Sequence, residues 1–328
     1  MGSLFSGQLE EKPMVVVIPS YQNKRWSSSN IKSVLDQDYN NFRIIYVNDA
    51  SSDGTGKKVE EVLTRYEKKG KYSFSKSQIN NKVGSNIQSV SSHFTGQINR
   101  TNAFFRLVNN SNRSGALSNV YRSVYSCKDE EIVVVLNGDD WFADNQVLKR
   151  LNELYSSEEV WMTYGGSVEY GSDTISSHPI PQEVVEHNAF RSGKAPTHLC
   201  SFYSWLFKKI NTADLLFGGK FFPMASDAAM MYPMIEMAGE RHAYIDQISY
   251  MHNQANLIGP NKVDPTLRTM LTRAIMDRQP YERLSDKNDQ INHKNRIVVE
   301  NKINSLIELE LLNFKMGGVS QRDLFNGL

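Results

Sequence analysis

The segment from Glu130 to Phe142 constrains the fold more than any other part of the sequence. Five consecutive apolar residues starting at Ile132 run directly into an Asn-Gly-Asp-Asp turn. Such an uninterrupted run, rich in β-branched residues, is typical of a strand buried on both faces of a parallel sheet. Open α/β sheets bind ligands at the carboxyl ends of their strands, so we expect a site after this strand. The carboxylates of Asp139 and Asp140 suit Mn²⁺ or Mg²⁺ that also takes diphosphate oxygens, and a solvated acidic turn explains the pair equally well.

Strand and helix patterns alternate through much of the chain. Strands are expected at 14–18, 42–47, 104–108, 132–136, 160–164 and 244–251. Helical spacing of apolar residues is found at 31–35, 59–66, 116–125, 147–155 and 199–210, and a methionine-rich helix is expected to end at Met237. Strands and helices that alternate with short links predict right-handed parallel units. The sequence therefore predicts an α/β fold with a mixed, mostly parallel sheet flanked by helices.

Two regions depart from this alternation. Residues 68–102 are rich in Ser, Asn, Lys and Gln with little periodicity, so we expect an inserted, mobile excursion there. Residues 296–314 have the apolar spacing of an amphipathic helix, which packs on the domain or on a second copy of the chain. We expect a flexible segment at 1–13, one domain at 14–260 and a helical extension at 261–328.

Charge and cysteine usage narrow the class of protein. Lys and Arg total 37 against 36 for Asp and Glu, so no overall field attracts nucleic acid or a membrane surface. The two cysteines, Cys127 and Cys200, have no metal-like or redox-like spacing, which favours a reduced, cytoplasmic protein and leaves a disulfide open. No apolar run is long enough to span a membrane.

The first six residues, Met-Gly-Ser-Leu-Phe-Ser, fit the N-myristoylation pattern. Many recombinant proteins also begin with Met-Gly-Ser, so the pattern has two explanations. A single acyl chain would give only a weak, reversible membrane anchor. We therefore expect a cytoplasmic protein that associates with membranes if Gly2 is acylated.

Acidic residues at predicted strand ends are the candidate catalytic and metal-binding residues. The sequence lacks the phosphate-loop, dinucleotide and serine-hydrolase glycine motifs. Asp49 and Asp139 close two predicted strands, and Asp227 precedes a predicted helix. If these strands are neighbours, their ends gather in one crevice. Asp53 is instead interpreted as a helix cap or turn residue.

Three motifs together resemble the family 2 glycosyltransferases of GT-A fold. They are Val15–Tyr21, Asn48–Thr55 and Leu136–Asp140, and the resemblance extends over about residues 13–255. It implies a metal-dependent, inverting hexosyltransferase that moves a sugar from a nucleotide diphosphate donor, with UDP favoured, to an acceptor hydroxyl. The acceptor would be a glycan, a glycoside or a protein. Residues 14–140 would form the nucleotide-binding half, and residues 141–260 the acceptor half.

The resemblance also implies roles for single residues on the donor side. The residues expected to contact the nucleotide are Pro19, Ser20, Tyr21, Asp49, Arg113, Gly115, Asn137 and Gly138. Within this set Asp49 would bind the base and Asn137 the ribose. An Arg at a Gly-containing turn, as at Arg113, also suits a diphosphate on chemical grounds.

The remaining roles concern the metal, the base and the acceptor. Asp139 and His252 would hold the metal ion, and Asp227 would be the general base. Asp140 would support the turn or contact the sugar. Trp141 and His198 would line the acceptor side, although a core position for Trp141 and a capping role for His198 explain them as well.

Two alternatives to an active transferase remain. Asn137 stands where the family usually has Asp, and Ser226 stands where an acid often precedes the base. These departures favour a catalytically inactive nucleotide- or carbohydrate-binding protein of the same fold. A sugar nucleotidyltransferase would need a glycine-rich loop after the first strand, and Pro19–Lys24 has no glycine.

Overall fold

The computed structural model describes residues 9–68, 75–83, 86–98, 101–156, 159–172, 174–256 and 264–291. Within them, ten strands form one sheet in the order β3-β4-β5-β2-β1-β6-β9-β8-β12-β7. Its centre is parallel and consists of β5 (Thr101–Asn110), β2 (Phe42–Asn48), β1 (Met14–Ser20) and β6 (Ile132–Val135). The apolar runs predicted as buried strands thus lie side by side at the centre of the sheet.

Antiparallel pairs complete the sheet on both sides. Beyond β5 lie β4 (Asn86–Ile98) and β3 (Ser75–Val83). Beyond β6 lie β9 (Cys200–Tyr203), β8 (Met162–Glu169), β12 (His242–His252) and β7 (Trp141–Phe142), with β8 and β12 parallel to each other. The predicted fold class, a mixed α/β sheet flanked by helices, is confirmed.

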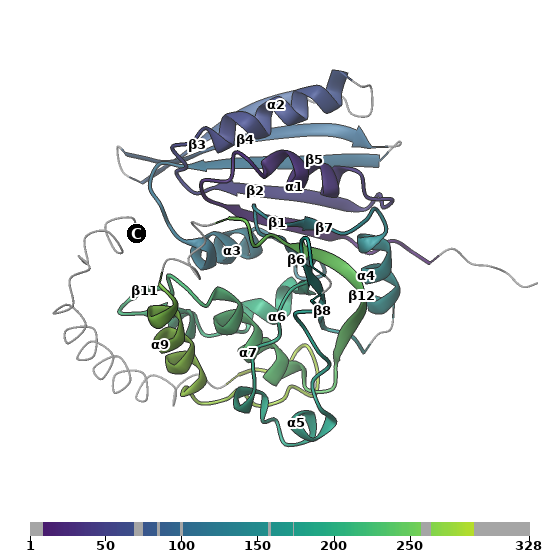
Figure 1. The fold of residues 1–328 in the computed structure, drawn as a ribbon, viewed down its shortest axis with the longest axis vertical. Coiled ribbons are helices and arrows are strands. Elements are labelled where there is room, and N and C mark those ends of the chain that lie inside the picture. The colour runs from purple at the N-terminus through teal and green to yellow at the C-terminus, as the bar shows by residue number, and fades with distance from the viewer. Residues whose placement is uncertain are drawn as a thin grey trace, which may run out of the picture.

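Helices cover both faces of this sheet (Figure 1). Successive side chains of a strand point to opposite faces, so Val16 and Ile18 enter one core and Val15 and Val17 enter the other. The first core is closed by α1 (Ser27–Leu35), α2 (Thr55–Lys68) and α4 (Val147–Tyr155). The second is closed by α3 (Ala116–Tyr125), α6 (Ser204–Lys208), α7 (Ser226–Ala238) and α9 (Pro265–Met276).

Short elements connect the second half of the chain. They are α5 (Gln182–Glu186), the 3-10 helices η1 (Phe190–Ser192) and η2 (Thr212–Leu215), and the two-residue strands β10 (Leu216–Phe217) and β11 (Lys220–Phe221). Among its described residues, the segment between β8 and β9 has α5 and η1 as its only helices. This irregular segment borders the site described below.

The prediction of irregular chain at 68–102 is wrong for the described residues. β3 and β4 form an antiparallel hairpin, and β4 pairs with β5 from Ser89 to Ile98. Ser91 and Ser92 are buried in β4, where small polar residues take the positions that apolar residues usually mark. The alternation that reveals a strand is therefore missing, although the backbone pairing is regular.

The predicted helix at 199–210 is also wrong in its first part. Cys200–Tyr203 is a strand between β6 and β8, and only Ser204–Lys208 is helical. Aromatic residues favour either structure, and pairing with two neighbouring strands decides the outcome here. The predicted helix at 296–314 and the acylation pattern at residues 1–6 lie outside the described residues.

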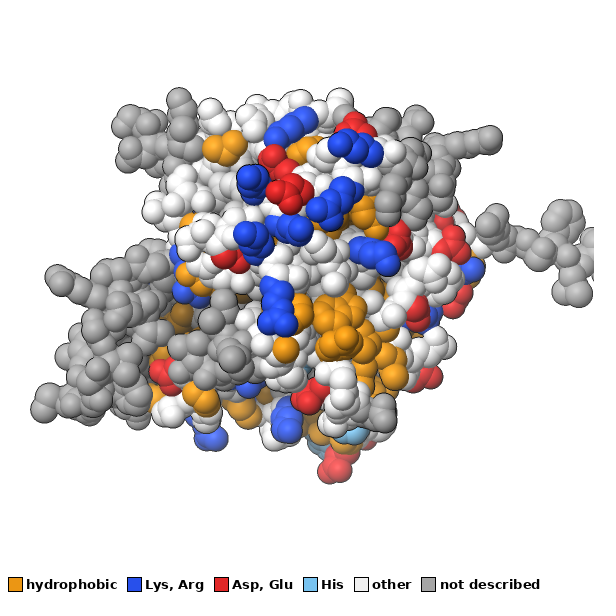
Figure 2. Space-filling view, turned by 45° about the horizontal axis from the view of Figure 1, so that its top comes forward, with side chains coloured by type: hydrophobic (Ala, Val, Ile, Leu, Met, Phe, Trp, Pro, Cys, Tyr) orange, Lys and Arg blue, Asp and Glu red, His pale blue; other side chains and the backbone are white. Residues whose placement is uncertain are grey.

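The surface carries charges of both signs. Figure 2 shows Lys and Arg side chains mixed with Asp and Glu over the upper part of the molecule, and a hydrophobic patch below them. On α2, for example, Lys57, Glu61 and Arg65 are all exposed. Both cysteines, Cys127 and Cys200, are free and buried. In the described part of the chain, no helix combines the length and apolar character needed to cross a bilayer.

Candidate active site

The carboxyl ends of β1, β2 and β6 meet at one edge of the sheet, as their parallel pairing requires. The turn after β6 lies directly against the end of β1, because Gly138 N donates a 3.0 Å hydrogen bond to the Pro19 carbonyl. A Cβ atom on Gly138 would collide with the Ser20 hydroxyl and with the Asn23 amide. Glycine is therefore needed at this position for close approach of two backbones, which brings the predicted nucleotide residues Pro19, Ser20 and Gly138 together.

Asp49, at the end of β2, holds the loop that precedes α3. Its carboxylate is buried and accepts hydrogen bonds from Asn110 Nδ2 at 2.8 Å, Ser114 N at 2.8 Å and Gly115 N at 2.9 Å. Gly115 has a φ of 83°, a conformation that favours glycine, and α3 starts at the next residue. Asp49 thus positions this loop, and its contact with a base remains a prediction.

The loop that Asp49 holds presents Arg113 to Tyr21. The guanidinium carbon of Arg113 lies 4.0 Å from the centre of the Tyr21 ring, so the two side chains stack. Both are partly buried. A planar cation on an aromatic ring, next to the amino end of α3, offers donors and positive charge to a diphosphate. The structure brings these two predicted residues together from β1 and from the loop after β5.

The two acids after β6 have different surroundings. Asp140 is 1% exposed and accepts hydrogen bonds from the Tyr250 hydroxyl at 2.5 Å, Asn253 N at 2.7 Å and Asn137 Nδ2 at 3.2 Å. Burial, followed by repulsion from Asp139, raises the pKa of Asp140 to about 7. Asp140 therefore braces the turn, which is one of its two predicted roles, and it is not exposed to a sugar.

Asp139 is only partly buried, so its carboxylate is accessible to a ligand or a metal ion. Its Oδ2 atom accepts a 2.8 Å hydrogen bond from Asn256 Nδ2. His252 lies at the end of β12, one residue before Asn253, which contacts both acids through Asp140 Oδ1 and the Asp139 carbonyl. Asp139 and His252 are thus brought to the same edge from two distant parts of the chain.

The donor atoms present fit a metal ion that is shared with a ligand. Among the described residues no group of three His, Cys, Asp or Glu side chains could enclose a metal. Mg²⁺ and Mn²⁺ sites in proteins commonly use one or two carboxylates and complete their coordination with phosphate oxygens. The partly exposed carboxylate of Asp139, with His252 nearby, suits a cation held jointly with a diphosphate.

Asp227 is in the first turn of α7, and its side chain is 36% exposed. Its Oδ2 atom lies 3.5 Å from Nε2 of His198. The His198 ring stacks on Tyr250 at 4.7 Å, and its Nε2 is also 3.5 Å from Asn137 Nδ2. Its Nδ1 is buried and has no hydrogen-bond partner among the described residues. His198 therefore links the predicted base to the acidic turn, and its capping role is not observed.

Several residues of the site were not identified from the sequence. Tyr250, Asn253 and Asn256 bind the two acids, and Asn30 of α1 donates to the carbonyls of Asn137 and Asp140 at 2.9 and 2.8 Å. The signal for Tyr250 and Asn253 was their position at the end of a predicted strand beside His252. Asn30 gave no signal, because its role depends on how α1 packs against the turn.

Trp141 forms an aromatic pair at the rim of the site. Its ring lies 4.8 Å from that of Tyr170 in an edge-to-face arrangement, and Tyr170 is 57% exposed. Trp161, by contrast, is buried against Trp205. Trp141 is therefore partly exposed beside the acids and is not a core residue, as an acceptor contact requires.

Comparison with solved structures identifies the fold as that of the GT-A glycosyltransferases. TarS 1-349 from S. aureus is similar, with a TM-score of 0.50, 14% identity and coverage of 74% of this chain and 60% of that one. The mannosyltransferase PcManGT from Pyrobaculum calidifontis, solved with GDP-Man and Mn²⁺, has a TM-score of 0.47 and 14% identity, with coverage of 81% of this chain and 61% of that one. Glucosyl-3-phosphoglycerate synthase from Mycobacterium tuberculosis was solved with Mn²⁺, UDP and glucosyl-3-phosphoglycerate. It has a TM-score of 0.49 and 12% identity, with coverage of 81% of this chain and 78% of that one. The chain thus spans about 60% of the length of TarS 1-349.

The family comparison is more specific than the fold. The family model "Glycosyl transferase family 2" matches residues 15–101, which include β1, β2 and the motif around Asp49. This match confirms the resemblance to family 2 glycosyltransferases predicted from the sequence. A search of curated proteins gives no significant match. The matched segment ends before Asp139 and Asp227, so the roles of these two residues depend on geometry and chemistry.

Proposed function

We propose that this protein is a glycosyltransferase that moves a hexose from a nucleotide diphosphate, with UDP favoured, to an acceptor hydroxyl with inversion at the anomeric carbon. One observation carries the proposal. The acidic turn and Asp227 meet at one atom of the His198 ring, because its Nε2 lies 3.5 Å from Asn137 Nδ2 and 3.5 Å from Asp227 Oδ2. A base this close to the turn that would hold the leaving group would allow an acceptor hydroxyl and the donor to be held together for displacement.

The donor side supplies positioning and positive charge. Arg113, stacked on Tyr21, and the backbone amides at the start of α3 would contact the diphosphate. Asp49 keeps this loop in place through three hydrogen bonds. Asp139 and His252 would hold a divalent cation, which when bound neutralises charge on the departing diphosphate.

The acceptor side supplies the base. The Asp227 carboxylate would take the proton of the acceptor hydroxyl while the oxygen of that hydroxyl forms a bond to the anomeric carbon. The bond between that carbon and the diphosphate oxygen breaks, and the nucleoside diphosphate leaves with the electron pair. His198 would orient Asp227, because its ring is fixed by stacking on Tyr250.

Thermal unfolding with a panel of nucleotide sugars tests donor binding. A ligand that binds only the native state at about 100 times its Kd stabilises it by about 2.7 kcal/mol. We expect one class among UDP-, GDP- and TDP-sugars to raise the Tm in the presence of Mn²⁺, and EDTA to remove most of that increase. UMP, which lacks the diphosphate, is the control. If no nucleotide sugar changes the Tm, the proposal is wrong.

A further inference from the structure

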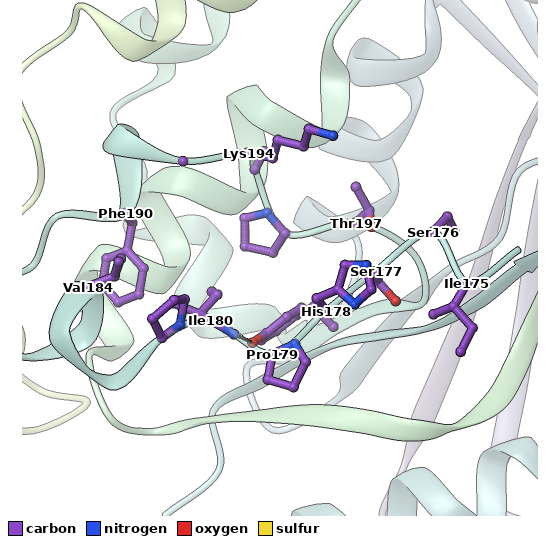
Figure 3. A pocket seen from close by; sticks show the side chains of 15 residues that line it. Ile175, Ser176, Ser177, His178, Pro179, Ile180, Val184, Phe190, Lys194 and Thr197 are labelled. Carbon is purple, nitrogen blue, oxygen red and sulfur yellow. Dashed lines mark hydrogen bonds between the residues drawn. The ribbon is translucent and has the colours of Figure 1, made fainter.

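A cavity of about 410 Å³ lies beside the catalytic edge, within the irregular segment between β8 and β9 (Figure 3). It is lined by Tyr164 of β8, the loop at 175–181, residues of α5 and η1, and the stretch at 193–197. Its volume is within the range of small-molecule sites in proteins. None of the residues assigned above to donor binding lines it, so it is a separate site.

The lining is mostly apolar at one end and has hydroxyl groups at the other. Figure 3 shows Val184 and Phe190 on one side, and Ser177 and Thr197 on the opposite side together with Ile175. The lining residues include Lys194 and no acidic residue. Such a cavity favours an amphipathic ligand with an apolar group and a neutral or anionic head.

A buried hydroxyl in the lining lacks a partner. Ser177 is 5% exposed, and its Oγ atom has no hydrogen-bond partner among the described residues. The backbone around it is fixed, since the Tyr244 hydroxyl donates to the Ser177 carbonyl at 3.0 Å and Ile180 N donates to the Tyr164 hydroxyl at 2.8 Å. Buried polar atoms are nearly always paired, so an unpaired one in a pre-formed cavity indicates a ligand.

The polar end of the cavity is adjacent in the chain to the predicted catalytic site. Thr197 immediately precedes His198, whose Nε2 lies 3.5 Å from Asp227. On the other side, the hydroxyl of Tyr232 in α7 donates a 2.7 Å hydrogen bond to the Gly193 carbonyl. The helix that carries the predicted base therefore also holds the wall of the cavity.

We propose that this cavity binds the acceptor by an alkyl or aryl group. The apolar group lies against Val184 and Phe190, and a polar or anionic head lies near Lys194 and Thr197, from which the reacting hydroxyl reaches Asp227. The acceptor is accordingly an amphipathic molecule and not a plain sugar. Naming the ligand as the acceptor rests on the proposed function, whereas the existence of an amphipathic binding site does not.

Gly193 allows the cavity to be filled with little strain. A Cβ atom there would meet no atom within 4 Å, and its φ of −116° is open to any residue. We therefore expect Gly193→Trp to fold and to obstruct the cavity, with Gly193→Ala as the matched control. Val184→Glu, on a partly exposed wall, provides a second variant that places an acid at the apolar end.

Calorimetry with octyl phosphate and ethyl phosphate tests the site directly. Octyl phosphate should bind the wild type at least about tenfold more tightly than ethyl phosphate, because its chain is removed from water. Gly193→Trp and Val184→Glu should each weaken octyl phosphate binding at least about tenfold, whereas Gly193→Ala should change it less than about twofold. Phenyl phosphate distinguishes an aryl from an alkyl preference.

The imidazole NMR signals test the link to catalysis. Octyl phosphate should shift the ring signals of His198, assigned with His198→Gln, and leave those of His93 on β4 unchanged. Equal binding of the two phosphates, or full binding by both Gly193→Trp and Val184→Glu, overturns the site. Binding that leaves His198 unmoved overturns its assignment to the acceptor. UDP affinity, measured on the same samples, tests the proposed function separately. It should be the same in the wild type and in all of these cavity variants.

Discussion

Key polar groups of the predicted donor and acceptor sides differ in how they are satisfied. On the donor side, the carboxylates of Asp49 and Asp140 each accept three hydrogen bonds from the protein itself. On the acceptor side, Nδ1 of His198 and Oγ of Ser177 are buried without a partner among the described residues. These two donor-side carboxylates are therefore satisfied before any ligand binds, whereas the two acceptor-side atoms are not, although Oδ1 of Asn30 and Oδ1 of Asn48 on the donor side also lack a partner among the described residues.

This difference has a physical consequence for binding. Groups that are already fixed by hydrogen bonds lose little entropy when a ligand arrives, which favours a rigid, pre-organised donor site. Unpaired buried groups carry a desolvation cost that a matching ligand relieves, which favours selectivity for the acceptor. Substitutions on the donor side should thus change nucleotide affinity, and those on the acceptor side should not.

Asp139→Ala should have the largest effect on nucleotide affinity. Removing the partly exposed carboxylate should weaken UDP binding about 10- to 100-fold in Mn²⁺, equivalent to roughly 1.4–2.8 kcal/mol. Calorimetry of the wild type in EDTA should give a similar loss, and EDTA should not weaken the variant further. Asp144→Ala, which removes a nearby acid that pairs with Arg150, is the control. Unchanged affinity in both EDTA and Asp139→Ala would show that the metal assignment is wrong.

Arg113→Lys should have a smaller effect. Lysine keeps the charge and loses the planar group that stacks on Tyr21 at 4.0 Å, so UDP affinity should fall about five- to tenfold. Arg65→Lys, on the exposed surface of α2, should leave the affinity unchanged. Equal affinities of the two variants would remove Arg113 from the donor site.

An ion pair at the opposite end of β2 and β6 allows protein stability to be tested separately from nucleotide binding. Glu131, at the start of β6, accepts hydrogen bonds from Arg43 of β2 at 2.7 and 2.8 Å. Burial alone would raise the pKa of Glu131, but the hydrogen bonds from Arg43 and from Lys128 N lower it below its usual value. Because the folded-state pKa is depressed, this stabilisation is present above the unfolded-state pKa and is lost as the pH falls through the folded-state value.

Glu131→Gln should therefore lower the free energy of unfolding by roughly 1–2 kcal/mol at pH 7, with no change in UDP affinity. The difference between variant and wild type should shrink as the pH falls below the unfolded-state pKa of about 4.3, and should disappear only below the depressed folded-state pKa, where the wild-type carboxyl is protonated. Denaturant unfolding at several pH values measures both effects. Asp129→Asn, in an exposed pair with Lys208, should change stability by less than about 0.5 kcal/mol. A similar loss in the two variants would contradict this assignment.

The sequence predicted the donor side better than the acceptor side for a physical reason. Strands β1, β2 and β6 are buried on both faces, so each appears as an apolar run followed by its functional residues. The acids and their order could therefore be identified before the fold was known. The contacts of Asp140 with Tyr250 and Asn253 could not, since they join residues more than a hundred positions apart.

The acceptor side depends on irregular backbone. The cavity is formed by Tyr164 and by residues 175–197, which have few regular elements and no periodic apolar pattern. Likewise β4 was missed because serines occupy its buried positions, and β9 was taken for a helix because its pairing partners are distant in sequence. Tertiary context, and not local propensity, decides these structures.

Release of nucleoside diphosphate from the nucleotide sugar that stabilises the protein most is the most direct test of a transferase. The wild type with Mn²⁺ should release it by hydrolysis or by transfer. Asp227→Asn, which removes the base without changing its size, should lower the rate about 100- to 10,000-fold and leave the Tm increase on nucleotide binding intact. A wild type that binds the nucleotide sugar without turnover would instead be an inactive binding protein, and turnover that survives in Asp227→Asn would contradict the assignment of the base.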